Sequence, residues 1–213
     1  MASWEPFTDA LPGRTFVSFD APGVGASGTP LLPVPMPVLA EIAAGVLDAA
    51  GVGRADVLGY SHGGVVAQQL AVAAPARVRR LVLAATSCGL GATPGSCFAL
   101  RAVREPLEGH PWARPSLIGA WWQSLAFAGW STLPFLGGIR TPTLVVCGTG
   151  DRVVPPVNSA LLARRIPGAG LVLMPGDHDL QRRGPAADLA RVVEPFLAGS
   201  DEVPPRHASG TAA

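Results

Sequence analysis

Three residue types that together support nucleophilic catalysis occur in this chain in the order serine, aspartate, histidine. Ser61 is the centre of GYSHG, a G-x-S-x-G pattern that follows an apolar run and opens a helical pattern. Asp151 follows a second apolar run, in CGTGDRVVP, and His178 follows a third, in MPGDHDL. A sharp strand-to-helix turn exposes a serine hydroxyl, and an imidazole oriented by a carboxylate accepts its proton. The pattern therefore predicts Ser61 as nucleophile, His178 as base and Asp151 as orienting acid in attack on an acyl carbon.

The residues beside Ser61 and His178 should influence the same reaction. Because the turn places Ser61 at the start of a helix, we expect the backbone N–H of His62 to face a developing oxyanion. Asp177 and Asp179 flank the histidine, and carboxylates that approach an imidazole favour its protonated form. We therefore expect these two aspartates to weaken His178 as a base if they reach the ring.

Hydrophobic periodicity predicts the elements that position these residues. Continuous runs of apolar, β-forming residues predict buried strands at 14–20, 55–60, 78–86, 142–149 and 170–176. Apolar residues at helical spacing, with glycine and proline stops, predict helices at 3–11, 37–51, 63–75, 159–167 and 186–199. Strands that alternate with helices predict an α/β fold, a mainly parallel sheet with helices on both faces. The three candidate residues then share the carboxyl edge of the sheet, where sites of such folds form.

Residues 88–138 interrupt the alternation and contain four of the five tryptophans. One interpretation is a short cap that shapes an apolar acyl pocket, with Tyr60, Trp121, Trp122 and Trp130 as candidate lining residues. The other is a local core packed on the scaffold, where tryptophan is ordinary. The sequence leaves both interpretations open.

Length and composition predict one domain in a reducing compartment. Residues 1–198 are expected to form this domain, and the polar, proline-rich segment 199–213 a disordered tail. The formal net charge of +1 offers no attraction to nucleic acid or to an anionic membrane. We see no signal peptide and no apolar run of the roughly 18 residues that a membrane span needs. Three cysteines without C-x-x-C spacing indicate free thiols, so a cytoplasmic protein is expected.

Two kinds of cofactor site lack the residues that they require. All 16 basic residues are arginine, so the chain has no lysine for a P-loop or for a pyridoxal Schiff base. Gly23, Gly25 and Gly28 form a G-x-G-x-x-G pattern, but the TPLLPVPMP that follows contains four prolines and cannot open a helix at once. We therefore interpret this stretch as a glycine-rich turn and not as a dinucleotide site.

With these residues in place, the chain resembles the α/β-hydrolase superfamily, and within it the intracellular poly(3-hydroxyalkanoate) depolymerases and related serine esterases. The segments that carry the resemblance are WEPFTDALPGRTFVSFDAPGVGASGTP, DVLGYSHGGVVAQQLA, VRRLVLAAT, FAGWSTLPFLGGIRTPTLVV and LLARRIPGAGLVLMPGDH, within residues 4–195. The resemblance implies nucleophile, acid and base at Ser61, Asp151 and His178. It also implies cleavage of carboxylic esters of hydroxy acids without metal or cofactor, and association with polymer granules.

The sequence departs from the family pattern at its start. A family member normally has three strands and a glycine-bearing oxyanion loop before the helix that opens here at Ser3. The third of these strands normally lies between those matching 14–20 and 55–60. The loop supplies the second oxyanion donor, whose loss slows catalysis on the order of 100- to 1000-fold. We expect either that the start at Met1 is set too late within a complete hydrolase, or that the chain is a repurposed member with little activity.

The expected function is therefore hydrolysis of a carboxylic ester, a polyhydroxyalkanoate or a small ester, through an acyl-enzyme on Ser61. One alternative is another reaction of the same triad, such as carbon–carbon bond hydrolysis or perhydrolysis. A second alternative is a non-catalytic binding or granule-associated protein that keeps the scaffold. Modification of Ser61 by a fluorophosphonate separates the catalytic interpretations from the non-catalytic one.

Overall fold

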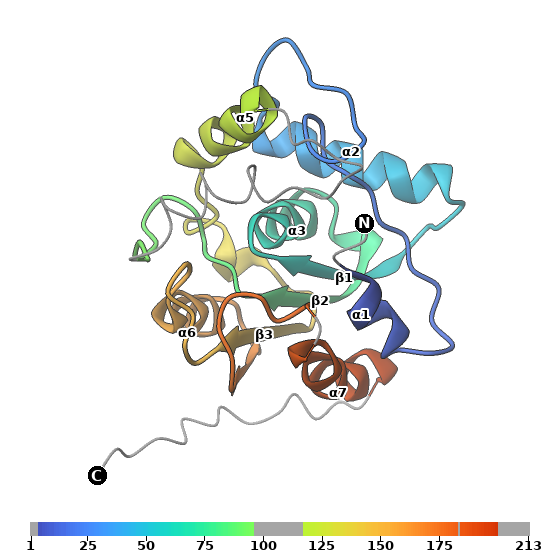
Figure 1. Cartoon of the computed structure of the whole chain (residues 1–213), viewed down its shortest axis with the longest axis vertical. Coiled ribbons are helices and arrows are strands. Elements are labelled where there is room, and N and C mark those ends of the chain that lie inside the picture. Colours follow the sequence, from blue (N-terminus) through green and yellow to red (C-terminus); the bar gives the residue numbers. More distant parts are fainter. Residues whose placement is uncertain (1–3, 96–116, 183, 200–213) are drawn as a thin grey trace.

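The structure, a computed structural model, describes residues 4–95, 117–182 and 184–199 (Figure 1). Within these ranges the chain folds around a parallel sheet of four strands in the order β1-β2-β3-β4. The strands are β1 (Ala55–Tyr60), β2 (Val78–Ala84), β3 (Thr143–Gly148) and β4 (Gly170–Met174). Because all neighbouring strands are parallel, their carboxyl ends lie at one edge of the sheet. This arrangement confirms the predicted α/β fold.

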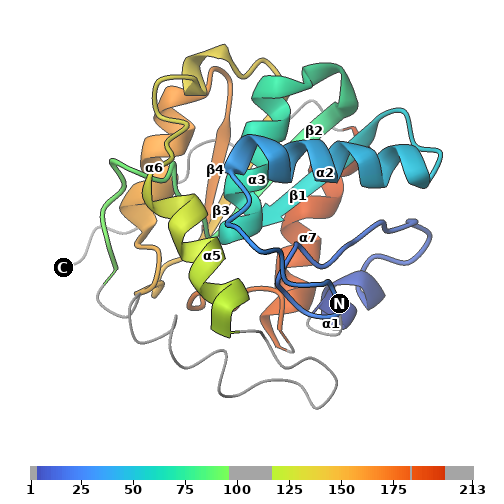
Figure 2. The ribbon, with the colours of Figure 1, turned by 90° about the horizontal axis from the view of Figure 1, so that it is seen from above.

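Helices cover both faces of the sheet (Figure 1). The helices are α1 (Glu5–Asp9), α2 (Met36–Ala49), α3 (His62–Ala73), α5 (Leu117–Ala128), α6 (Pro156–Arg165) and α7 (Pro185–Ala198), with 3-10 turns η2 (Pro75–Arg77) and η3 (Leu136–Gly138). On one face α3 packs against β1 and β2, and α2 packs on α3 (Figure 2). The opposite face is covered by α1 and α7, which also contact each other.

The alternation of side chains along each strand explains the two layers. In β2, Leu81 and Leu83 belong to the core cluster beneath α2, α3 and α6, whereas Val82 belongs to the cluster that faces α1 and α7. All residues of β3 are buried. A strand that is covered on both faces needs apolar side chains at every position, and for this reason continuous apolar runs predicted these strands correctly.

The predicted strand at 14–20 is wrong. This segment has no strand conformation, and Phe16, Val17 and Phe19 are 42%, 43% and 39% exposed. Within the described residues β1 pairs only with β2, so the segment 14–20 does not join the sheet as a strand. β-forming side chains favour a strand only where a partner strand satisfies the backbone. Arg14 instead holds the segment beside the domain by a bidentate hydrogen bond to Glu194.

The glycine-rich stretch after this segment forms a turn, as predicted. The N–H of Gly23 donates to the carbonyl of Gly28 at 2.9 Å, and the N–H of Ala26 donates to the Asp20 carboxylate at 3.0 Å. The next helix, α2, opens only at Met36, after the prolines. The geometry required for a dinucleotide at a helix N-terminus is therefore not formed here.

The insertion predicted at 88–138 is described in part. Residues 96–116 lie outside the described residues, and so does the predicted tail from residue 200 onward. In the described part, α5 contacts the turn at 22–30, because Trp122 Nε1 donates to the carbonyl of Pro30 and Gln123 Nε2 to that of Pro22. None of the helices in the described ranges is long and apolar enough to cross a membrane.

Candidate active site

Ser61 occupies a strained turn between β1 and α3. Its φ of 51° and ψ of −120° are unusual for a non-glycine residue, and such a conformation costs on the order of 1–3 kcal/mol. Three hydrogen bonds hold it: the Ser61 N–H donates to the Ala84 carbonyl at 2.9 Å, and the Ser61 carbonyl accepts from the Gly64 N–H at 3.0 Å and from Thr86 Oγ1 at 2.7 Å. The turn is the strand–serine–helix geometry that the motif predicts.

Two glycines allow the turn to close. A Cβ atom on Gly59 would lie 2.6 Å from the Gly63 carbonyl oxygen and from Gly64 Cα, so strand and helix could not approach. A Cβ atom on Gly64 would lie 2.5 Å from Thr86 Cβ. The space around Gly63, the second glycine of the motif, is open. The steric requirement therefore falls on Gly59 and Gly64.

The structure brings Ser61, His178 and Asp151 together. His178 Nε2 lies 3.0 Å from Ser61 Oγ, and His178 Nδ1 lies 2.8 Å from Asp151 Oδ2. The other carboxylate oxygen of Asp151 accepts the N–H groups of Val153 and Val154 at 2.9 and 2.8 Å. Since His178 and Asp151 are each only 3% exposed, water does not compete strongly for these contacts. The arrangement can carry a proton from a serine hydroxyl to an imidazole that a carboxylate orients.

The loops of the acid and the base are joined by backbone hydrogen bonds. Asp151 follows β3 and His178 follows β4, the neighbouring strand. The N–H of Thr149 donates to the Met174 carbonyl at 2.9 Å, and the N–H of Gly150 donates to the Gly176 carbonyl at 2.8 Å. These two bonds extend the strand pairing into the loops and fix the spacing of acid and base.

The two aspartates that flank His178 have partners in the structure. Asp179 Oδ1 accepts a hydrogen bond from the Tyr60 hydroxyl at 3.2 Å and lies 3.6 Å from Arg182 Nε. Asp177 Oδ1 accepts the N–H of Asp179 at 3.0 Å. The predicted weakening of the base by these carboxylates stays a prediction.

His62 follows Ser61 as the first residue of α3. Its backbone N–H has no carbonyl four residues earlier within the helix, so this donor is available at the start of α3. Burial lowers the pKa of its imidazole to about 4, so the ring is neutral at pH 7. The Nε2 atom is buried without a hydrogen-bond partner among the described residues. The assignment of the His62 N–H to the oxyanion stays a prediction.

The aromatic residues predicted to line a pocket occupy different environments. Tyr60 packs against His178, with ring centroids 5.2 Å apart. Trp122 bonds to the turn at 22–30, and Trp130 donates to Gln69 Oε1 at 3.1 Å while packing on the cluster of Met36, Leu39 and Val65. Trp121 is 64% exposed. Of the four, only Tyr60 contacts a residue of the triad in the contacts described, and the pocket role of all four stays a prediction.

Two supporting residues were missed by sequence reasoning. Thr86 donates to the Ser61 carbonyl, and its place at the end of a predicted strand was the signal that could have found it. Gln68 is fully buried in α3; its amide donates to the carbonyls of Gly64 and Ser87, and its oxygen accepts from Thr132 Oγ1 at 2.6 Å. A polar residue on the buried face of an apolar helix was the corresponding signal.

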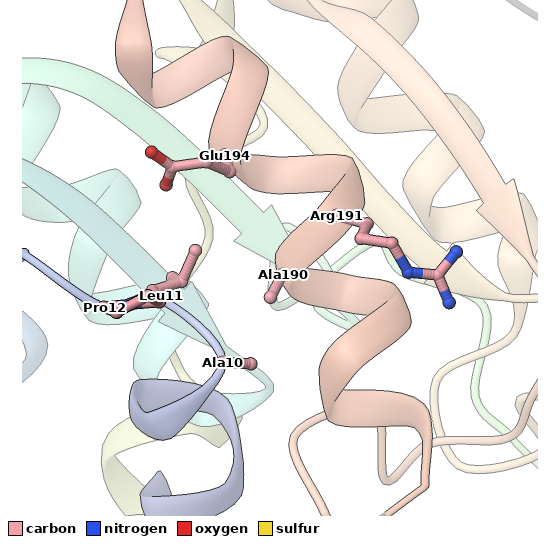
Figure 3. Close-up of a pocket in the computed structure, with 6 residues that line it drawn as sticks. All are labelled: Ala10, Leu11, Pro12, Ala190, Arg191 and Glu194. Carbon is pink, nitrogen blue, oxygen red and sulfur yellow. The ribbon is translucent and has the colours of Figure 1, made fainter.

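A hollow lies away from the triad, between α1 and α7 (Figure 3). It is lined by Ala10, Leu11, Pro12, Ala190, Arg191 and Glu194. Arg191 is paired with Asp188, and Glu194 with Arg14, so its charged side chains already have partners. In the described part of the chain, no three His, Cys, Asp or Glu side chains are grouped as metal ligands.

The parallel sheet with helices on both faces defines an α/β protein, and the contacts of His178 bring Ser61 and Asp151 together at the carboxyl edge of this sheet. Comparison with known proteins agrees, because a family model described as alpha/beta hydrolase fold matches residues 1–120. The chain belongs to the alpha/beta hydrolase fold family.

The similarity extends beyond the family model. The chain is 36% identical over 203 residues to a poly(3-hydroxyalkanoate) depolymerase of Ectopseudomonas oleovorans, which covers 81% of this chain and 72% of that protein. It is 31% identical over 192 residues to a 2-hydroxymuconate semialdehyde hydrolase of Pseudomonas putida, covering 76% and 68%. A solved hydrolase of Pseudomonas aeruginosa PA01 superposes with a TM-score of 0.76 at 31% identity, covering 93% of this chain and 85% of that one.

Proposed function

We propose that this protein is a serine hydrolase that cleaves carboxylic ester bonds through an acyl-enzyme. The observation that carries the proposal is the position of His178, whose two ring nitrogens lie 3.0 Å from Ser61 Oγ and 2.8 Å from Asp151 Oδ2. An imidazole in this position can act first as a base and then as an acid, while the carboxylate stabilises its charged form.

The geometry supports a two-stage reaction. In the first stage Ser61 Oγ attacks the acyl carbon, its proton moves to His178 Nε2, and the imidazolium then protonates the departing alcohol. The negative charge on the acyl oxygen develops beside the start of α3, where the His62 N–H can donate. In the second stage His178 Nε2 takes a proton from a water molecule that attacks the acyl carbon, and it returns this proton to Ser61 Oγ as the acyl group leaves. Asp151 accepts the hydrogen bond from Nδ1 in both stages.

Stabilisation of the oxyanion should limit the rate. The His62 N–H is the single donor that we assign to the oxyanion from the described residues. A site with one donor is expected to turn over on the order of 100- to 1000-fold more slowly than a site with two. Covalent modification of Ser61 is therefore a more sensitive test of this chain than multiple turnover.

For the substrate we propose esters of hydroxy acids, a poly(3-hydroxyalkanoate) or a small ester. The similarity to the Ectopseudomonas oleovorans depolymerase supports this class. The apolar side chains of Leu31, Leu32 and Trp121 are 94%, 74% and 64% exposed, and exposed apolar groups favour contact with an apolar polymer surface. This supports the proposed association with polymer granules.

The test is the reaction of the purified chain with a fluorophosphonate, followed by mass spectrometry of the labelled peptide. We expect one adduct on Ser61 and hydrolysis of p-nitrophenyl butanoate, and the Ser61→Ala variant should lose both. Equal ester hydrolysis by wild type and Ser61→Ala would reject the proposal. A folded wild-type protein that takes no label would favour the non-catalytic, granule-binding alternative.

A second candidate is hydrolysis of a carbon–carbon bond by the same triad. The similarity to the Pseudomonas putida 2-hydroxymuconate semialdehyde hydrolase supports it. Incubation with 2-hydroxymuconate semialdehyde, followed by its absorbance, separates the two candidates. Faster consumption of this compound than of p-nitrophenyl esters, with dependence on Ser61, would favour the second candidate.

A further inference from the structure

Tyr60 links the strand that carries the nucleophile to the loop that carries the base. It is the last residue of β1 and directly precedes Ser61. Its hydroxyl donates to Asp179 Oδ1 at 3.2 Å, and its ring packs against the imidazole of His178 at a centroid distance of 5.2 Å. One side chain therefore contacts both the base and the residue that follows the base.

The contacts of Tyr60 with Asp179 and His178 restrict the distance between Ser61 and His178. His178 lies on a loop, and loops are the least constrained parts of a fold. Catalytic groups must be held within about 0.5 Å of their productive positions, and supporting hydrogen bonds provide this precision. Because Tyr60 and Ser61 are consecutive, any force that holds the His178 loop to Tyr60 also holds it to the nucleophile.

The ring of Tyr60 is itself held in place. Trp4 packs on it edge to face, with ring centroids 5.8 Å apart, and Phe7 packs on Trp4 in the same way at 5.7 Å. Phe7 is buried in the core cluster between α1 and α7. The Tyr60 ring therefore contacts both Trp4 and the imidazole of His178, and these contacts restrict its rotation.

Asp179 has a second, weaker partner. Arg182 Nε lies 3.6 Å from the same carboxylate oxygen, and the Arg182 side chain is 55% exposed. An exposed ion pair of this kind contributes little, since water screens it. The hydrogen bond from Tyr60 is part-buried and is therefore the stronger constraint on Asp179.

We propose that Tyr60 is a positioning residue: its hydroxyl, through Asp179, and its ring hold His178 within reach of Ser61. This inference rests on the proposed serine hydrolase function. Through this contact Tyr60 acts on the step in which the proton leaves Ser61.

The experiment compares fluorophosphonate labelling of Ser61 and p-nitrophenyl butanoate kinetics across a set of variants. Tyr60→Phe removes only the hydroxyl, Asp179→Ala removes the acceptor, and Asp179→Asn keeps an oxygen that can accept. We expect Tyr60→Phe and Asp179→Ala each to slow labelling and lower kcat by about 2- to 10-fold, the loss of one hydrogen bond, with KM unchanged. Asp179→Asn should restore most of the rate, and the control Asp188→Asn on α7 should match wild type.

The double variant Tyr60→Phe with Asp179→Ala distinguishes one shared contact from two separate effects. If the two residues act through their mutual hydrogen bond, the double variant is no slower than the slower single variant. The proposal would be overturned if the two single-variant rate losses multiply in the double variant. A changed KM with unchanged kcat, or wild-type rates in both single variants, would also overturn it.

Failure of the proposed function can be told apart from failure of this inference. If folded wild type takes no label, the proposed function fails. The positioning role is then read from the proton NMR signal of the His178 Nδ1–H, which Asp151 protects from exchange. We expect the signal in wild type and Asp188→Asn, and its loss or broadening in Tyr60→Phe and Asp179→Ala. An unchanged signal in all four proteins would overturn the positioning role regardless of activity.

Discussion

His178 Nδ1 lies 2.8 Å from Asp151 Oδ2, and this contact decides which ring nitrogen carries a hydrogen. A carboxylate accepts hydrogen bonds, so in the neutral imidazole Nδ1 is the donor to Asp151, and the lone pair of Nε2 faces Ser61 Oγ. The second carboxylate oxygen accepts the N–H groups of Val153 and Val154, so the carboxylate cannot rotate freely. The orientation of the His178 ring is therefore set by the loop that carries Asp151.

Asp151→Asn should reverse this tautomer. The side-chain NH2 of asparagine would donate to Nδ1, so the hydrogen would move to Nε2, which then could not accept the Ser61 proton. We expect fluorophosphonate labelling to slow on the order of 10,000-fold, with little change in folding. The exposed control Asp48→Asn, which loses only the ion pair to Arg77, should label like wild type. A decrease of less than tenfold in Asp151→Asn would contradict the assigned role.

Thr86→Val should loosen the turn at the nucleophile. Valine keeps the shape of threonine but cannot donate to the Ser61 carbonyl, which now accepts at 2.7 Å. We expect the free energy of unfolding to fall by about 0.5–1.5 kcal/mol and labelling of Ser61 to slow, because the strained backbone loses one of its restraints. Thr86→Ser keeps the hydroxyl and serves as the control. The same labelling rate in Thr86→Val and Thr86→Ser would show that the bond has no part in holding Ser61.

Gly64→Ala and Gly63→Ala form a matched pair of substitutions one residue apart. A Cβ atom on Gly64 would lie 2.5 Å from Thr86 Cβ, whereas a Cβ atom on Gly63 would enter open space. We expect Gly64→Ala to lower the free energy of unfolding by about 1–3 kcal/mol through overpacking. Gly63→Ala should leave it unchanged or raise it by up to about 1 kcal/mol, since alanine favours a helix. Urea unfolding checks both values, and equal midpoints would contradict the steric argument.

His62 should make the stability of the protein dependent on pH. Burial lowers the pKa of its imidazole to about 4 in the folded state, whereas the unfolded value is close to 6.5. The unfolded chain therefore binds more protons between these two values, and the free energy of unfolding falls as pH falls through this window. The expected contribution of His62 is a loss of about 2 kcal/mol between pH 7 and pH 5.

The measurement is urea unfolding of wild type and His62→Gln at pH 7 and pH 5. Glutamine does not titrate, so the variant should lose about 2 kcal/mol less stability than wild type over this interval. The difference between the stability losses of wild type and His62→Gln removes the contribution of all other titrating groups. Parallel losses in both proteins would show that His62 is not held neutral by burial.

Much of the fold could be predicted from local patterns. The runs that form β2 and β3 are apolar because most or all of their residues are buried, whereas the edge strands β1 and β4 are only partly buried. The G-x-S-x-G pattern lies where β1 meets α3. The segment 14–20 has the same β-forming composition and yet is no strand. Composition reports the preference of a segment, but a strand also needs a hydrogen-bonded neighbour, which is a property of the whole fold.

Local sequence patterns were sufficient to predict that Ser61, Asp151 and His178 meet at one edge of the sheet, because each follows an apolar run and parallel strands end on the same side. The contacts between Thr86 and Ser61 and between Tyr60 and Asp179 could be found only in the folded chain. These hydrogen bonds join residues that are 25 and 119 positions apart, and their formation depends on how loops pack, which no local pattern records.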